Sequence, residues 1–208
     1  MDRPPSFQTV DPETLTGGQR YQLLTSLVVP RPIGWISTVS PSGVRNLAPY
    51  SFFAALSGTP PMVGVSIGAR GGEAKDTLNN IRATGSFCVN VVSHSLLEAM
   101  NETSAEVGPD VDEFELAGLT PVEGTRVGAP WLSEAPAALE CLLSKEVGLA
   151  PSANTLVVGE VKAVHLSPAL EMVPGSWAID PNSLLPVGRL GGEAYTLLGE
   201  IRKLPRPR

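Results

Sequence analysis

Cysteine and histidine are scarce in this sequence of 208 residues. It contains two residues of each kind, Cys88, Cys141, His94 and His165, and no Cys-x-x-Cys pair. Zinc sites need several such ligands at close spacing, so we expect no metal site. Both cysteines lie in apolar, strand-like stretches, which favours their interpretation as small buried hydrophobic residues.

Basic residues are also few, and long apolar runs are missing. The 15 lysines and arginines are scattered and the formal net charge is −6, which argues against a nucleic-acid-binding face. Because no run of about 18 apolar residues occurs, we expect no membrane span. The opening residues MDRPPSFQTV lack the basic start and apolar run of a secretory leader, so we expect a cytoplasmic protein.

The length and the 42% hydrophobic content suit one domain over residues 1–208. A chain of this size buries about 70% of the surface that its unfolded form exposes, so a core needs neither disulfides nor metals. We expect residues 1–15 to form a flexible N-terminal extension. Residues 168–208 are irregular but apolar, and we expect them to pack on the rest of the domain or on a dimer partner.

Strand-like segments follow one another at short intervals and are joined mostly by turns. Counting them gives six or seven strands, and the pattern favours a closed or nearly closed β-barrel with helical additions. A Rossmann fold is not indicated, because GGEAKD does not match G-x-G-x-x-G, and no Walker sequence is present. The predicted strands cover residues 34–39, 44–57, 61–68, 86–93, 137–147 and 154–166.

Three helices are predicted, over residues 16–28, 76–85 and 96–102. Gly85 is a natural C-terminal cap for the second helix. Residues 102–130 are rich in proline, glycine and acids, and predict a long loop with little regular structure. The first and third helices carry capping-box pairs, Thr16 with Gln19 and Ser95 with Glu98.

The start of the second helix has features of an anion site. The first turn of a helix presents unpaired N–H groups and a partial positive charge. Lys75 adds a point charge and Thr77 a hydroxyl donor, while Asp76 is placed to cap the helix. Gly71 and Gly72, just before, would let a backbone approach closely. These residues predict a phosphate site, and the competing interpretation is a plain capped surface helix with a solvated lysine.

Two further stretches could border a ligand. NLAPYSFF, residues 46–53, could present backbone amides and the Ser51 hydroxyl to a flat ligand, or it could be an ordinary barrel strand. PRPIGWIST, residues 30–38, offers the hydroxyls of Ser37 and Thr38, which are also common strand residues. His165 ends a strand, and no Ser-His-Asp arrangement can be inferred around it.

Taken together, these stretches resemble one family. Their order and spacing over residues 17–200 are similar to those of the flavin reductase-like proteins with an FMN-binding split barrel, particularly the flavoredoxin-like branch. The stretches that carry the resemblance are PRPIGWISTVSPSGVRNLAPYSFF, PPMVGVSIG, KDTLNNIRATGSFCVNVVS, LEAMNETSA, DEFELAGLTPV and GEVKAVH.

The resemblance implies a mainly β fold, a six-stranded antiparallel Greek-key split barrel, working as a homodimer with FMN near the subunit interface. It places Lys75 and Thr77, with Asp76, at the FMN phosphate, and Ser51 and Ser66 near the phosphate and ribityl chain. The isoalloxazine would be lined by Ser37, Thr38, Asn46, Ala48, Pro49 and Tyr50. Its open face would be bordered by His165, the one candidate catalytic side chain, and by Arg189, Gly191 and Tyr195, from this subunit or its partner.

The resemblance also implies a function. The leading hypothesis is an oxidoreductase that transfers hydride from NADH or NADPH to FMN, with a monooxygenase or another redox protein as the acceptor. The alternative is a flavoredoxin-like electron-transfer protein that serves a protein partner without oxidising nicotinamides. A third hypothesis, a barrel that has lost its flavin, conflicts with the retained KDT and NLAPYSFF stretches.

Overall fold

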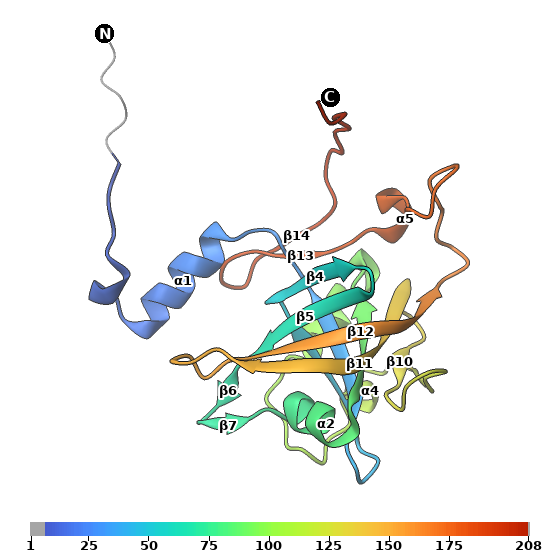
Figure 1. Cartoon of the computed structure of the whole chain (residues 1–208), viewed down its shortest axis with the longest axis horizontal. Helices are drawn as coiled ribbons and strands as arrows, with labels where there is room; N and C mark the ends of the chain where they lie inside the picture. Colours follow the sequence, from blue (N-terminus) through green and yellow to red (C-terminus); the bar gives the residue numbers. More distant parts are fainter. Residues whose placement is uncertain (1–6, 208) are drawn as a thin grey trace.

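A computed structural model describes residues 7–207, and its main feature is a single antiparallel sheet (Figure 1). Seven strands form this sheet in the order β3-β2-β8-β11-β12-β5-β4. Each predicted strand coincides with at least one of them. Their bounds are Gly34–Val39 (β2), Arg45–Tyr50 (β3), Phe53–Gly58 (β4), Pro61–Ile67 (β5), Ser86–Val91 (β8), Ala137–Gly148 (β11) and Thr155–Leu166 (β12).

The six-strand barrel expected from the resemblance is wrong in its strand count. The predicted strand over residues 44–57 divides at Ser51 and Phe52 into β3 and β4, which lie at opposite edges of the sheet. Pro49 in β3 cannot donate to a ladder, which suits an edge strand. Because only two residues link the two edges, the sheet must curl until they approach each other. No ladder joins β3 to β4 within residues 7–207, so the sheet stays open.

The curled sheet has a hydrophobic cluster on each face. Neighbouring residues on a strand point to opposite faces, so Ile36 joins one cluster and Trp35 joins the other. The first cluster includes Phe87 and Cys141, and the second includes Phe114 from outside the sheet. Both cysteines are buried, as predicted.

Helix α1 (Gly17–Leu27) begins at the predicted capping box. Thr16 accepts a hydrogen bond from the Gln19 backbone, and the Gln19 side chain accepts one from the Thr16 backbone. The apolar side chains of this helix are not covered by the sheet, since Tyr21 is 60% and Leu24 54% exposed. In Figure 1 the helix stands away from the sheet.

Helix α2 (Asp76–Thr84) ends at Gly85, which adopts the predicted left-handed conformation with φ of 71°. The prediction that Asp76 caps its start is wrong. Lys75 holds the extended capping position, and its carbonyl accepts hydrogen bonds from the N–H groups of Leu78 and Asn79. Asp76 is the first helical residue, where its negative charge complements the helix dipole.

The capping box expected for the third helix is also wrong. A 3₁₀ turn, η2 (His94–Leu96), precedes α3 (Leu97–Glu102), so Ser95 lies inside the turn rather than at a helix cap. Its hydroxyl forms a hydrogen bond with that of Ser93 instead.

The glycines before α2 lie in a tight hairpin. Strand β6 (Ala69–Arg70) pairs with β7 (Glu73–Ala74), and Gly71 and Gly72 connect them with φ of 57° and 89°. Two successive positive φ angles are the signature of a type I′ turn, which glycine adopts without steric cost.

After the sheet, the chain returns to the segment that precedes the sheet. Strand β13 (Gly188–Arg189) pairs with β1 (Arg31–Pro32) and with β14 (Tyr195–Thr196). Two expectations stay predictions: a flexible extension over residues 1–15 and a packed extension over residues 168–208. Residues 1–6 lie outside the described part. The other short elements are η1 (Pro12–Thr14), α4 (Glu113–Leu116), β9 (Pro121–Val122), β10 (Trp131–Leu132) and α5 (Pro181–Leu184).

Among residues 7–207, the helices are all too short or too polar to cross a bilayer. The stretch over 102–130, expected to be a loop, holds only the end of α3 and the short elements α4 and β9.

The close packing of Phe87 on Gly159 provides a test of the core. A Cβ atom at position 159 would lie 2.4 Å from Cζ of Phe87, a fully buried ring that cannot move aside. We expect Gly159→Ala to lower the free energy of unfolding by about 1–3 kcal/mol. Urea denaturation measures this change. At Gly148, in β11, a Cβ would meet no atom within 4 Å, so Gly148→Ala should stay within about 0.5 kcal/mol of the parent. Equal losses would contradict the packing described here.

Candidate functional site

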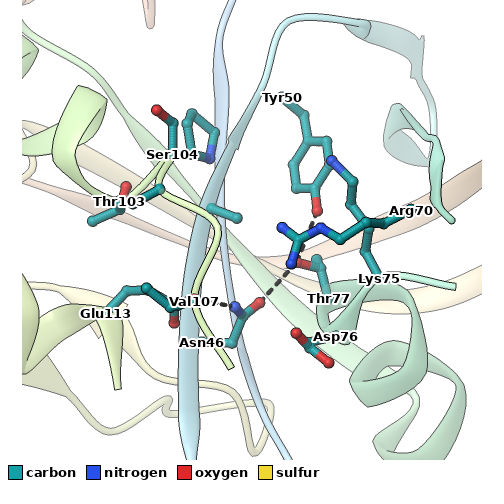
Figure 2. Close-up of a pocket in the computed structure, with 13 residues that line it drawn as sticks. Asn46, Tyr50, Arg70, Lys75, Asp76, Thr77, Thr103, Ser104, Val107 and Glu113 are labelled. Carbon is teal, nitrogen blue, oxygen red and sulfur yellow. Dashed lines mark hydrogen bonds between the residues drawn. The ribbon is translucent and has the colours of Figure 1, made fainter. Parts of the chain in front are cut away.

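A cavity of about 210 Å³ lies where β3 meets the start of α2 (Figure 2). Five segments of the chain form its walls: β3, the β6–β7 hairpin, the first turn of α2, the loop between α3 and α4, and the start of α4. We call it the first cavity. Its lining residues are Asn46, Ala48, Pro49, Tyr50, Arg70, Lys75, Asp76, Thr77, Thr103, Ser104, Ala105, Val107 and Glu113.

Positive charge gathers on the α2 side of the first cavity. The Nζ atom of Lys75 lies 5.7 Å from the centre of the Tyr50 ring, and Arg70 lies beside it, 3.6 Å from a carboxylate oxygen of Glu106. The backbone N–H groups of Asp76 and Thr77 open α2 and have no acceptor among the described residues. Two cations and a helix N-terminus together attract an anion.

A chain of hydrogen bonds fixes the wall of the cavity behind these cations. The Tyr50 hydroxyl donates to Thr77 Oγ1 at 2.9 Å, and Thr77 Oγ1 donates to Asn46 Oδ1 at 2.7 Å. The Asn46 amide then donates to Glu113 Oε1 at 2.9 Å. Because the Thr77 side chain is buried and its proton is committed to Asn46, only the backbone N–H of this residue is left to donate to a ligand.

Burial shifts the titration of two groups in this chain of hydrogen bonds. It raises the pKa of Tyr50 to about 12, against the opposing effect of the bond to Thr77, so the phenol stays protonated at neutral pH. Burial also raises the pKa of Glu113, against the lowering effect of its hydrogen bonds from Leu47 and Asn46. Tyr50 therefore acts as a fixed hydrogen-bond donor.

A second cavity of about 220 Å³ adjoins the first and shares Pro49 and Ser104 with it. Its walls come from α1, β13, β14, α3 and the link between β3 and β4. We call the two cavities together the groove. The second cavity is lined by Tyr21, Ile33, Pro49, Ser51, Met100, Asn101, Ser104, Arg189 and Tyr195.

The groove brings together most of the residues predicted from the sequence. In the first cavity these are Asn46, Ala48, Pro49, Tyr50, Lys75, Asp76 and Thr77, and in the second they are Ser51, Arg189 and Tyr195. Sequence reasoning missed Arg70, Ser104 and Glu113. The Gly-Gly turn after Arg70 was a usable signal, because a type I′ hairpin returns its first strand to the start of α2.

Comparison with known proteins identifies the family. Residues 26–177 match the model of the flavin reductase like domain. The chain belongs to this family. Three solved structures are similar to it: nitrilotriacetate monooxygenase component B from Bacillus cereus, 2-nitrobenzoate 2-nitroreductase NbaA from Pseudomonas fluorescens, and a putative flavin reductase with split barrel domain from Shewanella frigidimarina.

The likeness extends over nearly the whole of each chain. The Bacillus cereus protein is 35% identical with a TM-score of 0.92, covering 97% of this chain and 100% of its own. The Pseudomonas fluorescens protein is 29% identical with a TM-score of 0.87, covering 96% of both chains. The Shewanella frigidimarina protein is 27% identical with a TM-score of 0.82, covering 94% and 96%. Membership and fold together support an oxidoreductase that uses a flavin.

The groove fits the charged end of a flavin nucleotide. Lys75, Arg70 and the two free N–H groups of α2 supply donors and positive charge for a phosphate. Two carboxylates, Asp76 and Glu113, also line the first cavity, but Glu113 already accepts bonds from Asn46 and the Leu47 N–H. The α2 side of the first cavity therefore offers the donors and positive charge that suit an anion.

Three predicted contacts lie away from the groove. Ser37 is fully buried, donates to the Pro130 carbonyl and accepts a bond from Asn90. Ser66 accepts a hydrogen bond from Asn154. Gly191 packs against Ser26 on α1. That these residues contact a flavin remains a prediction from the family resemblance.

Thr38 has an indirect connection with the first cavity. Its buried hydroxyl donates to Asn46 Oδ1 at 3.3 Å and accepts from the Asn80 side chain at 3.1 Å. It therefore supports Asn46 from behind, and the structure gives it no place in the lining of the groove.

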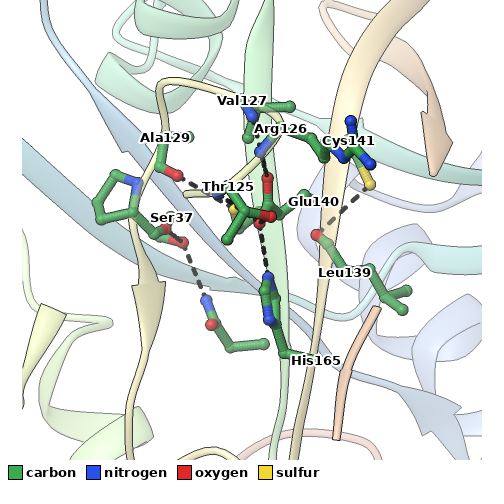
Figure 3. A network of polar contacts seen from close by, with 12 residues as sticks. Ser37, Thr125, Arg126, Val127, Ala129, Leu139, Glu140, Cys141 and His165 are labelled. Atoms are coloured by element: carbon green, nitrogen blue, oxygen red, sulfur yellow. Dashed lines mark hydrogen bonds and ion pairs between the residues drawn. The ribbon is translucent and has the colours of Figure 1, made fainter. Parts of the chain in front are cut away.

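His165 belongs to a different network, seen in Figure 3. Its Nε2 atom lies 2.6 Å from Glu140 Oε1, and its ring stacks on Trp131 with 4.4 Å between centres. None of these three residues lines the groove. His165 thus lies apart from the predicted residues that line the groove, and its contact with a flavin stays a prediction from the family resemblance.

Glu140 is the centre of that network. Its fully buried carboxylate accepts hydrogen bonds from the backbone N–H groups of Thr125, Arg126 and Val127 and from the Thr125 hydroxyl. Burial alone would raise the pKa of Glu140, but these bonds and His165 outweigh burial and lower it to about 2. The carboxylate thereby anchors the loop over residues 124–131.

The lowered pKa of Glu140 gives a pH-dependent test. Since the folded pKa of about 2 lies below the ordinary 4.5, its stabilisation is complete above about pH 4.5 and is lost as the pH falls towards 2. We expect Glu140→Gln to lower the free energy of unfolding by about 3 kcal/mol at pH 7. Urea denaturation from pH 7 to pH 2 should show this difference shrinking on acidification. A difference that is constant with pH would contradict the role of the charge.

Proposed function

We propose that this protein is an FMN-dependent oxidoreductase that oxidises NADH or NADPH. The observation that carries the proposal is the anion site at the start of α2, placed at one end of a groove in a flavin reductase-like fold. The choice of FMN among flavins is supported by the resemblance of the KDT stretch to the FMN-binding branch of the family.

The cofactor would extend over both cavities, with its phosphate in the first and its ring in the second. Lys75, Arg70 and the first N–H groups of α2 would hold the phosphate in the first cavity. Pro49 and Ser51, with Tyr195, offer the second cavity a flat apolar wall and a hydroxyl for the ring. When bound, FMN supplies the hydride-accepting chemistry, so the protein needs to bind, orient and exclude water rather than supply an acid and a base.

We also propose that the protein works as a homodimer that passes electrons to a monooxygenase or another redox protein. A third cavity, which is apolar and has a volume of about 390 Å³, lies between α1 and β4 and supports a dimer. Leu24, Val28 and Leu56 line this cavity with exposed side chains. Apolar surface of this kind is typical of protein interfaces. The similar Bacillus cereus protein is a monooxygenase component, which supports a monooxygenase as the acceptor.

Nicotinamide oxidation tests the proposed activity directly. The purified protein is mixed under air with FMN and either NADH or NADPH, and the absorbance at 340 nm is followed. We expect a loss faster than the rate without protein, with at least one of the two nicotinamides. A protein that stays yellow with both under anaerobic conditions, yet bleaches with dithionite, would instead be the electron-transfer protein of the alternative hypothesis.

Lys75→Ala tests the position of the phosphate. Losing one charge-assisted hydrogen bond should weaken FMN binding by about 1.5–3 kcal/mol, which is more than tenfold in affinity. Flavin fluorescence titration measures the change. Lys145→Ala removes an equal charge from an exposed position on β11, and FMN should bind this control like the parent. Unchanged affinity in Lys75→Ala would show that the phosphate lies elsewhere.

A further inference from the structure

The second cavity has an unusual balance of charge. In a chain with a net charge of −6, none of the residues that line this cavity carries a carboxylate, and one of them, Arg189, is a cation. Arg189 lies over the Tyr195 ring at 4.4 Å and donates to the Gly192 carbonyl. Within residues 7–207, it has no carboxylate within 4.0 Å.

A second guanidinium lies directly behind the wall of this cavity. Arg31 is only 6% exposed, and it faces Arg189 in the register of β1 and β13. Like charges directly opposite each other on paired strands are destabilising. Arg31 also lacks a carboxylate partner among the described residues, although a buried charge is costly unless it is paired.

Backbone carbonyl groups partly offset the cost of burying the positive charge of Arg31. Its Nη1 atom donates to the Thr25 and Val28 carbonyls at the C-terminal end of α1, and its Nη2 atom donates to the Leu190 carbonyl at 2.9 Å. The negative end of a helix dipole stabilises a cation here. These contacts hold the guanidinium in place but leave its unit positive charge without a counter-ion.

The Nε donor of Arg31 contacts a residue of the groove. Its Nε atom donates to Ser51 Oγ at 3.3 Å, and Ser51 lines the second cavity. Because the Ser51 oxygen accepts this bond, its O–H is left to donate, and no acceptor for it exists among residues 7–207. Arg31 therefore orients and polarises a hydroxyl that faces the cavity.

We infer that Arg31 is a positioning residue that makes the second cavity selective for the reduced form of the flavin. This rests on the proposed function, because it requires the flavin ring to occupy that cavity. Addition of a hydride to the neutral ring gives it one negative charge, which the Ser51 hydroxyl and the two guanidiniums would stabilise. The oxidised ring carries no such charge and gains less from the same groups.

The experiment measures FMN affinity in both redox states, with oxidised FMN in air and with FMN reduced by dithionite under anaerobic conditions. The parent protein should bind the reduced form more tightly. In Arg31→Gln this preference should fall at least tenfold, equivalent to about 30 mV in the two-electron midpoint potential of bound FMN. Arg31→Lys keeps the charge and should retain most of the preference.

Two further variants complete the design. Ser51→Ala removes the hydroxyl while Arg31 keeps its backbone contacts, and it should lower the preference several-fold even if Arg31→Gln fails to fold. Arg126→Gln removes an equal charge from an exposed side chain outside the groove and should match the parent. If the parent binds no FMN, the proposed function fails. If it binds FMN but Ser51→Ala and the folded Arg31 variants keep the parent's preference, only this inference is overturned.

Discussion

The side-chain amide of Asn46 is the contact on which the geometry of the groove depends. It lies on β3, donates to Glu113 on α4, and accepts the hydroxyl proton of Thr77 on α2. One side chain therefore fixes the distances between an edge strand, the start of α2 and the start of α4, which comes much later in the chain. All three side chains are buried and hydrogen-bonded, so the low local dielectric strengthens the hydrogen bonds between them, although burial still raises the pKa of Glu113.

This arrangement exists because the sheet curls without closing. The chain leaves β3 at Tyr50 and enters β4 at Phe53, on the far edge of the same sheet. Ser51 belongs to neither strand, and its side chain accepts a hydrogen bond from Arg31 instead. The same opening of the barrel that leaves the edges unpaired places a polar side chain in the wall of the second cavity.

Local patterns predicted the parts of the site that lie close together in sequence, and missed the parts that only topology joins. The start of α2, its terminal Gly85 and the NLAPYSFF stretch were all readable from neighbouring residues. Glu113 was not, because it meets the Leu47 backbone from 66 positions further along the chain, out of an acidic loop that resembles solvated surface. His165 was recognised as a candidate, but its contacts were not predicted, because its position at the end of a strand says nothing of its contact with Glu140.

A carboxylate in the wall of an anion site needs a physical explanation. The two oxygens of Glu113 accept bonds from the Asn46 amide and the Leu47 N–H, so its charge is drawn towards β3 and away from Lys75. The raised pKa of Glu113 shows that burial still outweighs these bonds. Tyr50 remains protonated, and hence the hydrogen bonds run in one direction, from its hydroxyl through Thr77 to Asn46. The carboxylate of Glu113 thus stays on the α4 side of the first cavity, and on the α2 side the cations Lys75 and Arg70 outnumber the one carboxylate, Asp76, which leaves the field there favourable to an anion.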